Sequence, residues 1–519
     1  MINFDNYNLS NSSPSFHPIK TPGLLKDLVL TYAQWSADIV VHGNVFDYQS
    51  IIVNGVAASN VTSVLADDNV TRIGVSDSAA NILSNLDALQ TASLVINIAI
   101  TNTDAAPLAV TYAQWSADKT ALDLVNTGLT VSGVAASDAA AVLADSHVSS
   151  ITVSSSGAAI LSNLAALQTA ATQITAITNT DAAPLAVTYA QWSADKTALD
   201  LVNTGLTVSG VAASNAAAVL ADSHVSSITV SSSGAAILSN LAALQTAAAH
   251  ITAITNTDAA PLAVTYAQWT ADKTALDLVN TGLILKGLSA GNAATVLADS
   301  HVSSVTVRDT SAHIISALDS LETGAAHISS IIVSDSDSIS VTANQLTSDA
   351  DILAKIDIDT INVNCSPSNS ARNMSGILGN VSFNYTKDTI STTSATHIDT
   401  ITGWSDDDSI HFNSALQVAG YKGIPKSGEA SINSTTGIAT FHASDNTLSL
   451  EIAAVHKAIA SASSSPVAGN VALWNYNGNA YALITGAHAG SGLAAHDTVI
   501  EFIGVNTSHV ELHNGILIA

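Results

Sequence analysis

The hydrophobic and polar positions of this chain repeat with a period of 77 residues. The clearest marker is a tryptophan that recurs as Trp115, Trp192 and Trp269, with nearly identical sequence between the copies. An earlier copy carries Trp35, 80 residues before Trp115, and a later copy has Leu346 in the same position. Self-similarity at a fixed period is typical of repeat architectures, which build extended surfaces more often than active sites.

Within one repeat, three short β-rich runs alternate with helix-like stretches. The runs cover residues 128–134, 148–153 and 174–178, and Leu129 and Val131 alternate with polar residues in the first run. An Ala-rich stretch of helical spacing follows each run. We therefore predict an α/β solenoid of stacked β-α coils, with about three coils in each 77-residue repeat.

The expected helices show buried stripes and capping signals. Ile160, Leu164 and Leu167 lie on one face of the helix after the second run. Thr188 and Gln191 have the form of a capping box, which opens the next helix. The recurring tryptophans fall on such stripes, so we interpret them as core residues in preference to a ladder that stacks on sugars.

Changes in composition along the chain predict four segments. The first 28 residues are polar and then broken by Pro14, Pro18 and Pro22, as expected of a lead-in that caps the open end of a repeat array. The segments are an N-terminal cap at 1–28, the repeat solenoid at 29–365, a linker at 366–388 and a β-rich domain at 389–519.

The last segment is expected to be β-rich because the long Ala-rich stretches disappear from it. One Ala-rich helix is predicted over residues 452–463. Strands are predicted over residues 398–404, 409–412, 437–441, 447–451, 471–476, 480–485, 498–502 and 510–518.

Charge and composition narrow the classes of partner. The chain has 41 Asp and Glu against 14 Lys and Arg, a net charge of −27 that repels phosphate backbones and argues against nucleic-acid binding. No run approaches the ~18 apolar residues of a transmembrane helix, and the N-terminal residues lack the basic and apolar regions of a cleaved secretory signal. The lone Cys365 excludes an intramolecular disulfide and is interpreted as a small buried hydrophobe.

The C-terminal segment resembles a known class of exported protein. Residues 399–404 and 408–412 resemble the strands that close bacterial RTX-type proteins, and residues 474–483, 497–505 and 515–519 resemble the C-terminal region of type I-secreted surface proteins, including some S-layer proteins. The resemblance implies export through an ABC-type secretion transporter, with an uncleaved C-terminal signal. The repeats are similar to those of large bacterial surface and adhesin-like proteins, but they lack the Gly-Gly-x-Gly-x-Asp nonapeptides that bind calcium, so calcium-driven folding of the solenoid is not implied.

The densest acidic run supplies the candidate metal ligands. Asp406, Asp407 and Asp408, with Asp399, could offer carboxylate oxygens to Ca²⁺, a hard cation that takes several such ligands. A solvated turn between two strands explains the same run and is the interpretation we favour. Asp335 and Asp337 rank below this run as metal ligands; no other cofactor is indicated.

Other recurring polar residues are interpreted as parts of the scaffold. His147, His224 and His301 recur at the 77-residue step, so they would lie three coils apart, too far for one metal site. Asp181 and Asp258, in the motif Asn-Thr-Asp-Ala-Ala-Pro, are expected to form turns.

These observations favour a structural protein over an enzyme. The chain contains no Gly-x-Ser-x-Gly elbow, His-Glu-x-x-His motif or P-loop, and an active site is a unique constellation whereas most of this chain is repeated. We expect an extracellular or cell-surface bacterial protein, an S-layer, biofilm-matrix filament or adhesin subunit that associates with its own copies and contacts cell-surface polysaccharide. The alternatives are a secreted ligand- or glycan-binding protein that uses the solenoid face, and a hydrolase with its site in the C-terminal domain.

Overall fold

The computed structural model describes residues 26–37, 48–365, 371–377, 379–385, 398–462, 468–486 and 497–519. The chain divides into two compact units. Unit 1 comprises Met1–Val211 and Ala218–Ile228, and unit 2 comprises Ala212–Ala217 and Thr229–Ala519. Nearly all of the predicted N-terminal cap, residues 1–28, lies outside the described residues.

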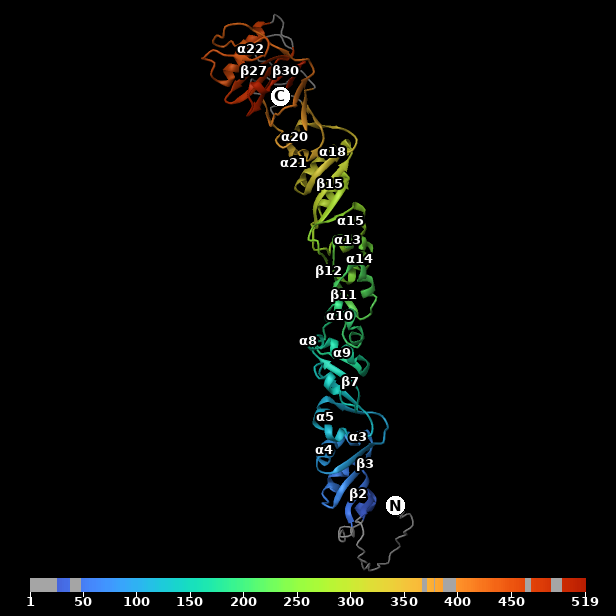
Figure 1. The fold of residues 1–519 in the computed structure, drawn as a ribbon. Helices are drawn as coiled ribbons and strands as arrows, with labels where there is room; N and C mark the ends of the chain where they lie inside the picture. Colours follow the sequence, from blue (N-terminus) through green and yellow to red (C-terminus); the bar gives the residue numbers. More distant parts are fainter. Residues whose placement is uncertain are drawn as a thin grey trace, which may run out of the picture. The chain divides into compact units, whose positions relative to one another are not determined.

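Unit 1 is built on parallel sheets, and within each sheet every strand pairs with the next strand along the chain; β4 and β8 make isolated bridges to Val125 and Val202. One sheet has the order β1-β2-β3-β4 and a second has the order β5-β6-β7-β8; β9 pairs with β10 in the same way. Figure 1 shows β2 and β3 in blue at the start of this series. The strands are β1 (Lys26–Thr31), β2 (Tyr48–Val56), β3 (Val70–Asp77), β4 (Asn97–Asn102), β5 (Leu108–Thr111), β6 (Leu129–Val134), β7 (Val148–Ser155), β8 (Ile174–Asn179), β9 (Leu185–Thr188) and β10 (Leu206–Val211).

Short helices connect these strands, because a parallel strand pair requires a crossover. They are α1 (Tyr32–Ala37), α2 (Val61–Leu65), α3 (Ala79–Ser84), α4 (Leu86–Val95), α5 (Tyr112–Ala117), α6 (Lys119–Leu122), α7 (Ala139–Leu143), α8 (Gly157–Ser162), α9 (Leu164–Ala170), α10 (Tyr189–Ala194) and α11 (Lys196–Leu199), with 3-10 turns at Ala58–Asn60 and Ala171–Gln173. The boundary between the units runs through α12 (Ala216–Leu220) and β11 (Val225–Ser232).

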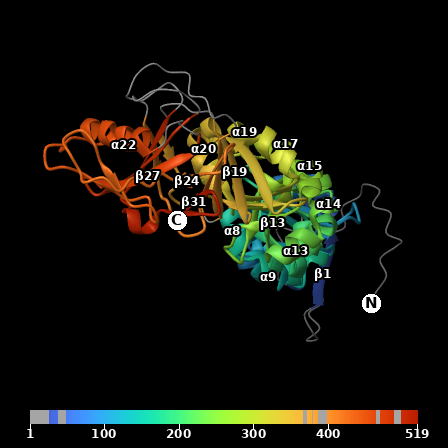
Figure 2. The ribbon, with the colours of Figure 1, turned by 90° about the horizontal axis from the view of Figure 1, so that it is seen from above.

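Unit 2 continues the same arrangement in its first part. A parallel sheet has the order β13-β14-β15-β16-β18. The strands of this sheet are β13 (Leu262–Val264), β14 (Leu283–Leu288), β15 (Val302–Asp309), β16 (Ile328–Val333) and β18 (Ile356–Asp357). The strand β12 (Ile251–Asn256) precedes them and belongs to the sheet of β11. The helices, several of which Figure 2 shows on the outside of the strands, are α13 (Gly234–Ser239), α14 (Leu241–Ala247), α15 (Tyr266–Ala271), α16 (Lys273–Leu276), α17 (Ala290–Leu297), α18 (Ser311–Ser316), α19 (Leu318–Thr323), α20 (Ala343–Ser348) and α21 (Ala350–Leu353), with 3-10 turns at Ala213–Asn215, Ala248–His250 and Ala325–His327.

The C-terminal part of unit 2 contains two six-stranded mixed sheets and one long helix, α22 (Leu448–Ala462), which lies beside β27. The first sheet is parallel from β17 through β19 and β21 to β23, and then β31 and β30 add antiparallel. Its strands are β17 (Ser338–Thr342), β19 (Thr360–Cys365), β21 (Asn380–Tyr385), β23 (Ser409–Phe412), β31 (Ile516–Ile518) and β30 (Glu511–His513). The second sheet contains β20 (Ala371–Asn373), β22 (Ile398–Thr402), β29 (Thr498–Ile503), β28 (Asn479–Ile484), β27 (Asn470–Tyr476) and β24 (Gln417–Val418); β25 (Ser431–Ile432) pairs with β26 (Ala439–Thr440), and a 3-10 turn covers Thr507–His509.

The described residues therefore form repeated parallel strand and helix units in stacked parallel sheets, followed by a β-rich region. This arrangement is compatible with the predicted α/β solenoid. All three predicted β-rich runs of the repeat are confirmed as β6, β7 and β8, and the capping box of Thr188 and Gln191 is present at the start of α10. The sequence patterns did not predict β9, which is only four residues long and follows a turn directly.

Alternating burial explains why these short strands are stable in the sheet. In β6 the side chains of Leu129, Val131 and Val134 are buried, while Ser132 is exposed. The helices add Ile160, Leu164 and Leu167 to the same core, and every copy repeats this layer. A single layer buries too little apolar area to balance its loss of conformational entropy, so each layer depends on its neighbours.

Two local predictions differ from the structure. Part of the predicted linker, residues 366–388, forms β20 and β21, and β21 extends the parallel pairing of β19 with six residue pairs. The predicted strand at 447–451 is instead the start of α22, because the Thr447 hydroxyl and carbonyl accept the amides of Leu450 and Glu451. The predicted strands at 398–404, 409–412, 471–476, 480–485 and 498–502 are confirmed as β22, β23, β27, β28 and β29.

A strained turn in each repeat allows a direct test of the backbone geometry. The exposed Ala105, Ala182 and Ala259 adopt φ values of 57°, 57° and 56°, in the left-handed region that favours glycine. We expect replacement of all three by glycine to raise stability by about 0.5–1 kcal/mol per site, measured by denaturant unfolding. The matched control replaces Ala109, Ala186 and Ala263, which lie in extended strands, with glycine. This change should lower the free energy of unfolding, and equal effects of the two sets would contradict the assigned turn.

Candidate functional site

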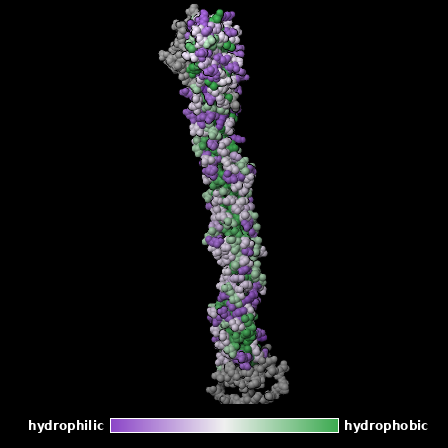
Figure 3. All heavy atoms as spheres, turned by 90° about the vertical axis from the view of Figure 1, so that its left-hand side faces the viewer, coloured by the Kyte–Doolittle hydropathy of each residue, from purple (hydrophilic) through white to green (hydrophobic). Residues whose placement is uncertain are grey.

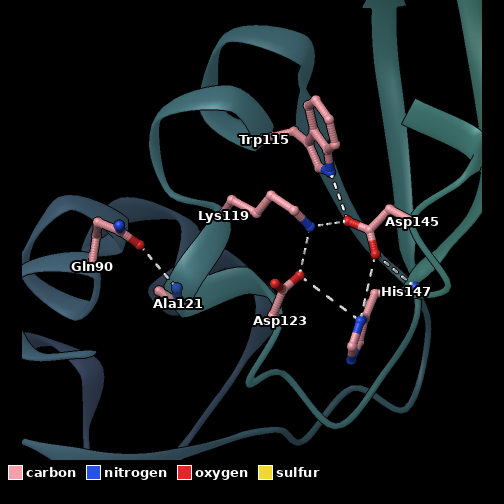
Figure 4. Close-up of polar contacts among 7 residues, drawn as sticks. All are labelled: Gln90, Trp115, Lys119, Ala121, Asp123, Asp145 and His147. Atoms are coloured by element: carbon pink, nitrogen blue, oxygen red, sulfur yellow. Dashed lines mark hydrogen bonds and ion pairs between the residues drawn. The ribbon is translucent and has the colours of Figure 1, made fainter. Parts of the chain in front are cut away.

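A polar cluster occurs three times in the structure at the 77-residue step. In the first copy it contains Trp115, Lys119, Asp123, Asp145 and His147 (Figure 4). Asp123, Asp145 and His147 bring ligand atoms within 4.8 Å of one another. The equivalent groups are Asp200, Asp222 and His224 in the second copy, and Asp277, Asp299 and His301 in the third.

Asp145 is the centre of this cluster. It follows α7 and its side chain is only 7% exposed. The Trp115 indole N–H, on α5, donates to Asp145 Oδ2 at 3.1 Å, and Lys119 Nζ, at the start of α6, donates to the same oxygen. Lys119 Nζ also donates to Asp123 Oδ1 at 3.0 Å. The lysine therefore joins two carboxylates that are 22 positions apart in the sequence.

The aromatic rings beside the lysine complete the contact. Lys119 Nζ lies 5.5 Å from the centroid of the Trp115 ring, a cation–π distance, and Tyr112 stacks on the same indole with centroids 5.9 Å apart. Trp269 is buried at 7% exposure, whereas Trp115 and Trp192 are half-buried. The prediction of core tryptophans is thus correct for Trp269 only. In all three copies the indole N–H donates to an aspartate, so the ring lies where the core meets a polar group.

Hydrogen bonds hold the carboxylate in its charged form. Burial tends to raise the pKa of Asp145, but donors from Lys119, the His147 backbone amide and Trp115 outweigh it and lower that pKa to about 2. The same groups around Asp222 and Asp299 also give pKa values of about 2. The pKa of each lysine amine is raised in return.

The histidine faces both carboxylates. His147 Nδ1 lies 3.5 Å from Asp145 Oδ1 and 3.8 Å from Asp123 Oδ1, and its backbone N–H donates to Asp145 Oδ1 at 3.0 Å. The predicted separation of the three recurring histidines from one another is compatible with this arrangement, because each belongs to a different copy of the cluster. The spacing of the histidines from one another does not reveal this cluster. The sequence signal for it is Lys-x-x-x-Asp, followed about one coil later by Asp-x-His.

A second contact joins neighbouring coils beside the cluster. The Gln90 side-chain oxygen, on α4, accepts the Ala121 backbone N–H at 2.9 Å (Figure 4). Gln168 and Gln245 make the same contact in later copies, and Glu322 makes it to Ile352. Each of these side chains satisfies an N–H group in the first turn of a helix, which has no partner within its own helix.

The predicted turn residues have a further role. Asn179 Oδ1 accepts the Asp181 backbone N–H at 3.1 Å, which confirms the turn. Asp181 Oδ2 in turn accepts the Gly157 N–H at 2.7 Å and so caps α8 in the preceding coil. Asp258 does the same for Gly234.

The predicted calcium ligands do not share one set of contacts. Asp399 is buried, pairs with Arg372 Nη1 at 2.9 Å and accepts the Tyr385 hydroxyl at 2.9 Å. Asp408 is also buried and accepts the backbone amides of Val381 and Ser405 at 2.8 and 2.9 Å.

The two remaining candidates, Asp406 and Asp407, lie exposed in the turn between β22 and β23, where Asp407 has a φ of 77°. Calcium binding at this turn stays a prediction.

Other candidate residues serve the fold. Asp335 accepts the Ser311 N–H at 2.7 Å at the start of α18, and Asp337 is exposed nearby. Cys365 is buried, and burial raises the pKa of its thiol to about 11, as expected of an unreactive hydrophobe.

In the C-terminal region, His456 Nε2 pairs with Asp497 Oδ2 at 3.1 Å. Their side chains are only 4% and 0% exposed, so this pair fastens α22 to its sheet and does not face solvent.

Comparison with known proteins gave no match to a family model, a curated protein or a solved structure. Within the described residues, no helix combines the length and the apolar character needed to cross a membrane.

The lowered pKa values predict acid lability of the repeats. Asp145, Asp222 and Asp299 have folded pKa values of about 2 against an ordinary value of 3.8. Their contribution to the free energy of unfolding is therefore present above about pH 4 and is lost as the pH falls towards 2. We expect about 2 kcal/mol per site. Denaturant unfolding followed from pH 7 to pH 2 measures this loss.

The control for this experiment replaces all three aspartates with asparagine. This variant should be less stable at pH 7 and should lose less stability between pH 4 and pH 2. An unchanged slope in this range would show that other carboxylates dominate the acid response.

Proposed function

We propose that this protein is a structural protein of a bacterial cell surface or extracellular matrix, an S-layer, filament or adhesin subunit whose repeats form an α/β solenoid of three β-α coils per 77 residues. The observation that carries the proposal is the repetition of the contacts between coils. The Trp-Asp-Lys contact occurs at Asp145, Asp222 and Asp299 with donor and acceptor atoms that are the same in all three copies. Selection for a scaffold preserves such contacts in every copy, whereas selection for catalysis acts on a single site.

The surface chemistry supports contact with cations. The charge of −27 favours solubility and contact with cations, and the lone cysteine is buried. On the face in Figure 3, hydrophobic residues come to the surface in separate patches among polar ones. Contact between copies at such patches, with cations between acidic groups, is the mode of self-association that we propose.

Export is proposed on the resemblance of the C-terminal residues to type I-secreted proteins. In this proposal the signal lies within residues 389–519 and is recognised by an ABC-type transporter. The chain would then act outside the cell, in contact with its own copies and with cell-surface polysaccharide.

Electron microscopy tests self-association. We expect the purified protein to form sheets or filaments in millimolar calcium, because divalent cations screen and bridge its acidic surface. Monodisperse monomers both with and without calcium would contradict the proposal. Binding of these monomers to a glycan array, retained after removal of residues 389–519, would favour the ligand-binding alternative.

The matched variant for this test replaces Asp406 and Asp407 with asparagine. Both residues are exposed in a turn, so the fold should be unaffected. Loss of the calcium effect in this variant would place a calcium site at the turn, and an unchanged effect would place it elsewhere.

The export proposal requires a test that separates signal from folding. Removal of residues 471–519 should retain the protein inside the cell, but it also removes β27 to β31. Residues 389–519 fused to an unrelated reporter are therefore needed as well. We expect the fusion to be secreted when the transporter is present, and normal secretion of the truncated chain would contradict the assignment of the signal.

A further inference from the structure

We propose that each Asp-Asp-His cluster binds a divalent transition-metal ion of the zinc type. The ligands would be one oxygen of Asp123, one oxygen of Asp145 and Nδ1 of His147, with the two equivalent sets in the following repeats. The inference rests on the geometry of the clusters and does not depend on self-association or export.

The distance between the histidine and Asp145 suits a shared ion better than a direct hydrogen bond, and Asp123 would have to move slightly closer to complete the site. An N–H···O bond places its heavy atoms about 2.7–3.2 Å apart. His147 Nδ1 lies 3.5 and 3.8 Å from the two carboxylate oxygens. Tetrahedral zinc bonds of about 2.0–2.2 Å hold ligand atoms about 3.3–3.6 Å apart. The same spacing recurs at His224, with 3.5 and 3.8 Å, and at His301, with 3.5 and 3.7 Å.

The orientation of the imidazole points to a cation between these groups. Since Nδ1 faces one oxygen of each carboxylate, an ion bound among the three groups would be coordinated by the Nδ1 lone pair and by both of these oxygens. The position of Asp145 Oδ1 is fixed by the His147 backbone N–H at 3.0 Å, so this ligand atom is held in place before an ion arrives. The cluster is open to solvent, because the side chains of Asp123 and His147 are 39% and 38% exposed.

Lys119 leaves room for the ion. Its Nζ contacts Asp145 through Oδ2, so Asp145 Oδ1 remains directed at the histidine. Asp123 Oδ1 lies near both Lys119 Nζ and His147 Nδ1, so the lysine and the ion would share this oxygen. The two carboxylates and the lysine ammonium together leave a charge of −1, which attracts a cation. The mixed nitrogen and oxygen ligands favour zinc-like metals, since Ca²⁺ takes six to eight oxygen ligands.

An ion at this position would join two consecutive loops. Asp123 follows α6, whereas Asp145 and His147 lie between α7 and β7, one coil further along the chain. Metal binding would therefore add a third tie between coils beside the Trp115 and Lys119 contacts. The stability of the repeats would increase with metal concentration.

Isothermal titration of the full chain with ZnCl₂ at pH 7.5 tests the proposal. We expect three ions per chain, and at least ~10-fold weaker binding of CaCl₂. Fewer than three zinc ions, or equal affinity for zinc and calcium, would overturn it.

The matched control replaces His147, His224 and His301 with asparagine. The first repeat already carries Asn69 at this position, and its backbone N–H donates to Asp67 Oδ1 at 3.1 Å as the histidine amide does in later copies. The variant should therefore fold normally in circular dichroism and lose the three zinc sites. Unchanged zinc stoichiometry in the folded variant would show that other surface groups bind the metal and would overturn the proposal.

A second variant distinguishes binding from a structural defect. Replacement of Lys119, Lys196 and Lys273 by methionine removes one positive charge from each cluster and keeps every proposed ligand. Zinc affinity should be equal to or higher than that of the unchanged chain. A loss of zinc binding in this folded variant would contradict the assigned ligands.

Discussion

The structure of the repeats depends on the parallel pairing of strands from successive coils. A parallel pair requires a crossover, and here the crossover contains short helices that also contribute buried apolar side chains to the layer. Since no layer is stable alone, cohesion must come from contacts between neighbouring coils. Val131 lies between Val110 and Ile151 in the sheet, and Ile177 lies between Val153 and Val202, so each has apolar neighbours on both sides.

Polar contacts fix the alignment of neighbouring coils, which apolar packing alone leaves loose. Hydrophobic burial is non-directional, and a layer of Ala, Val and Leu would tolerate small shifts between coils. Gln90, Asp181 and Asp145 each reach a backbone or side-chain donor in an adjacent coil, and these bonds have directional geometry. They lie at three different places around the coil, which fixes the rotation of one coil against the next.

Much of the fold could be predicted from the sequence, because repetition shows each pattern several times. The three β-rich runs and the capping box at Thr188 follow from period-2 alternation and from local hydrogen-bonding chemistry. The strand β9 and the start of α22 at Thr447 were missed, since four-residue segments carry too little periodicity to separate strand from helix. The polar cluster was missed because Asp123 and His147 come close only when the chain has completed one coil. Their separation in the sequence does not show this proximity.

The β9–β10 pairing has a consequence for how such a chain changes in evolution. β9 pairs with β10 in the same register as β5 with β6, so each 77-residue block ends where an identical block can begin. Recombination between the nearly identical gene segments would add or remove whole blocks and leave every local contact intact. The number of strand and helix units would then change by whole blocks, and natural variants of one gene would differ in repeat number while keeping the same surface chemistry.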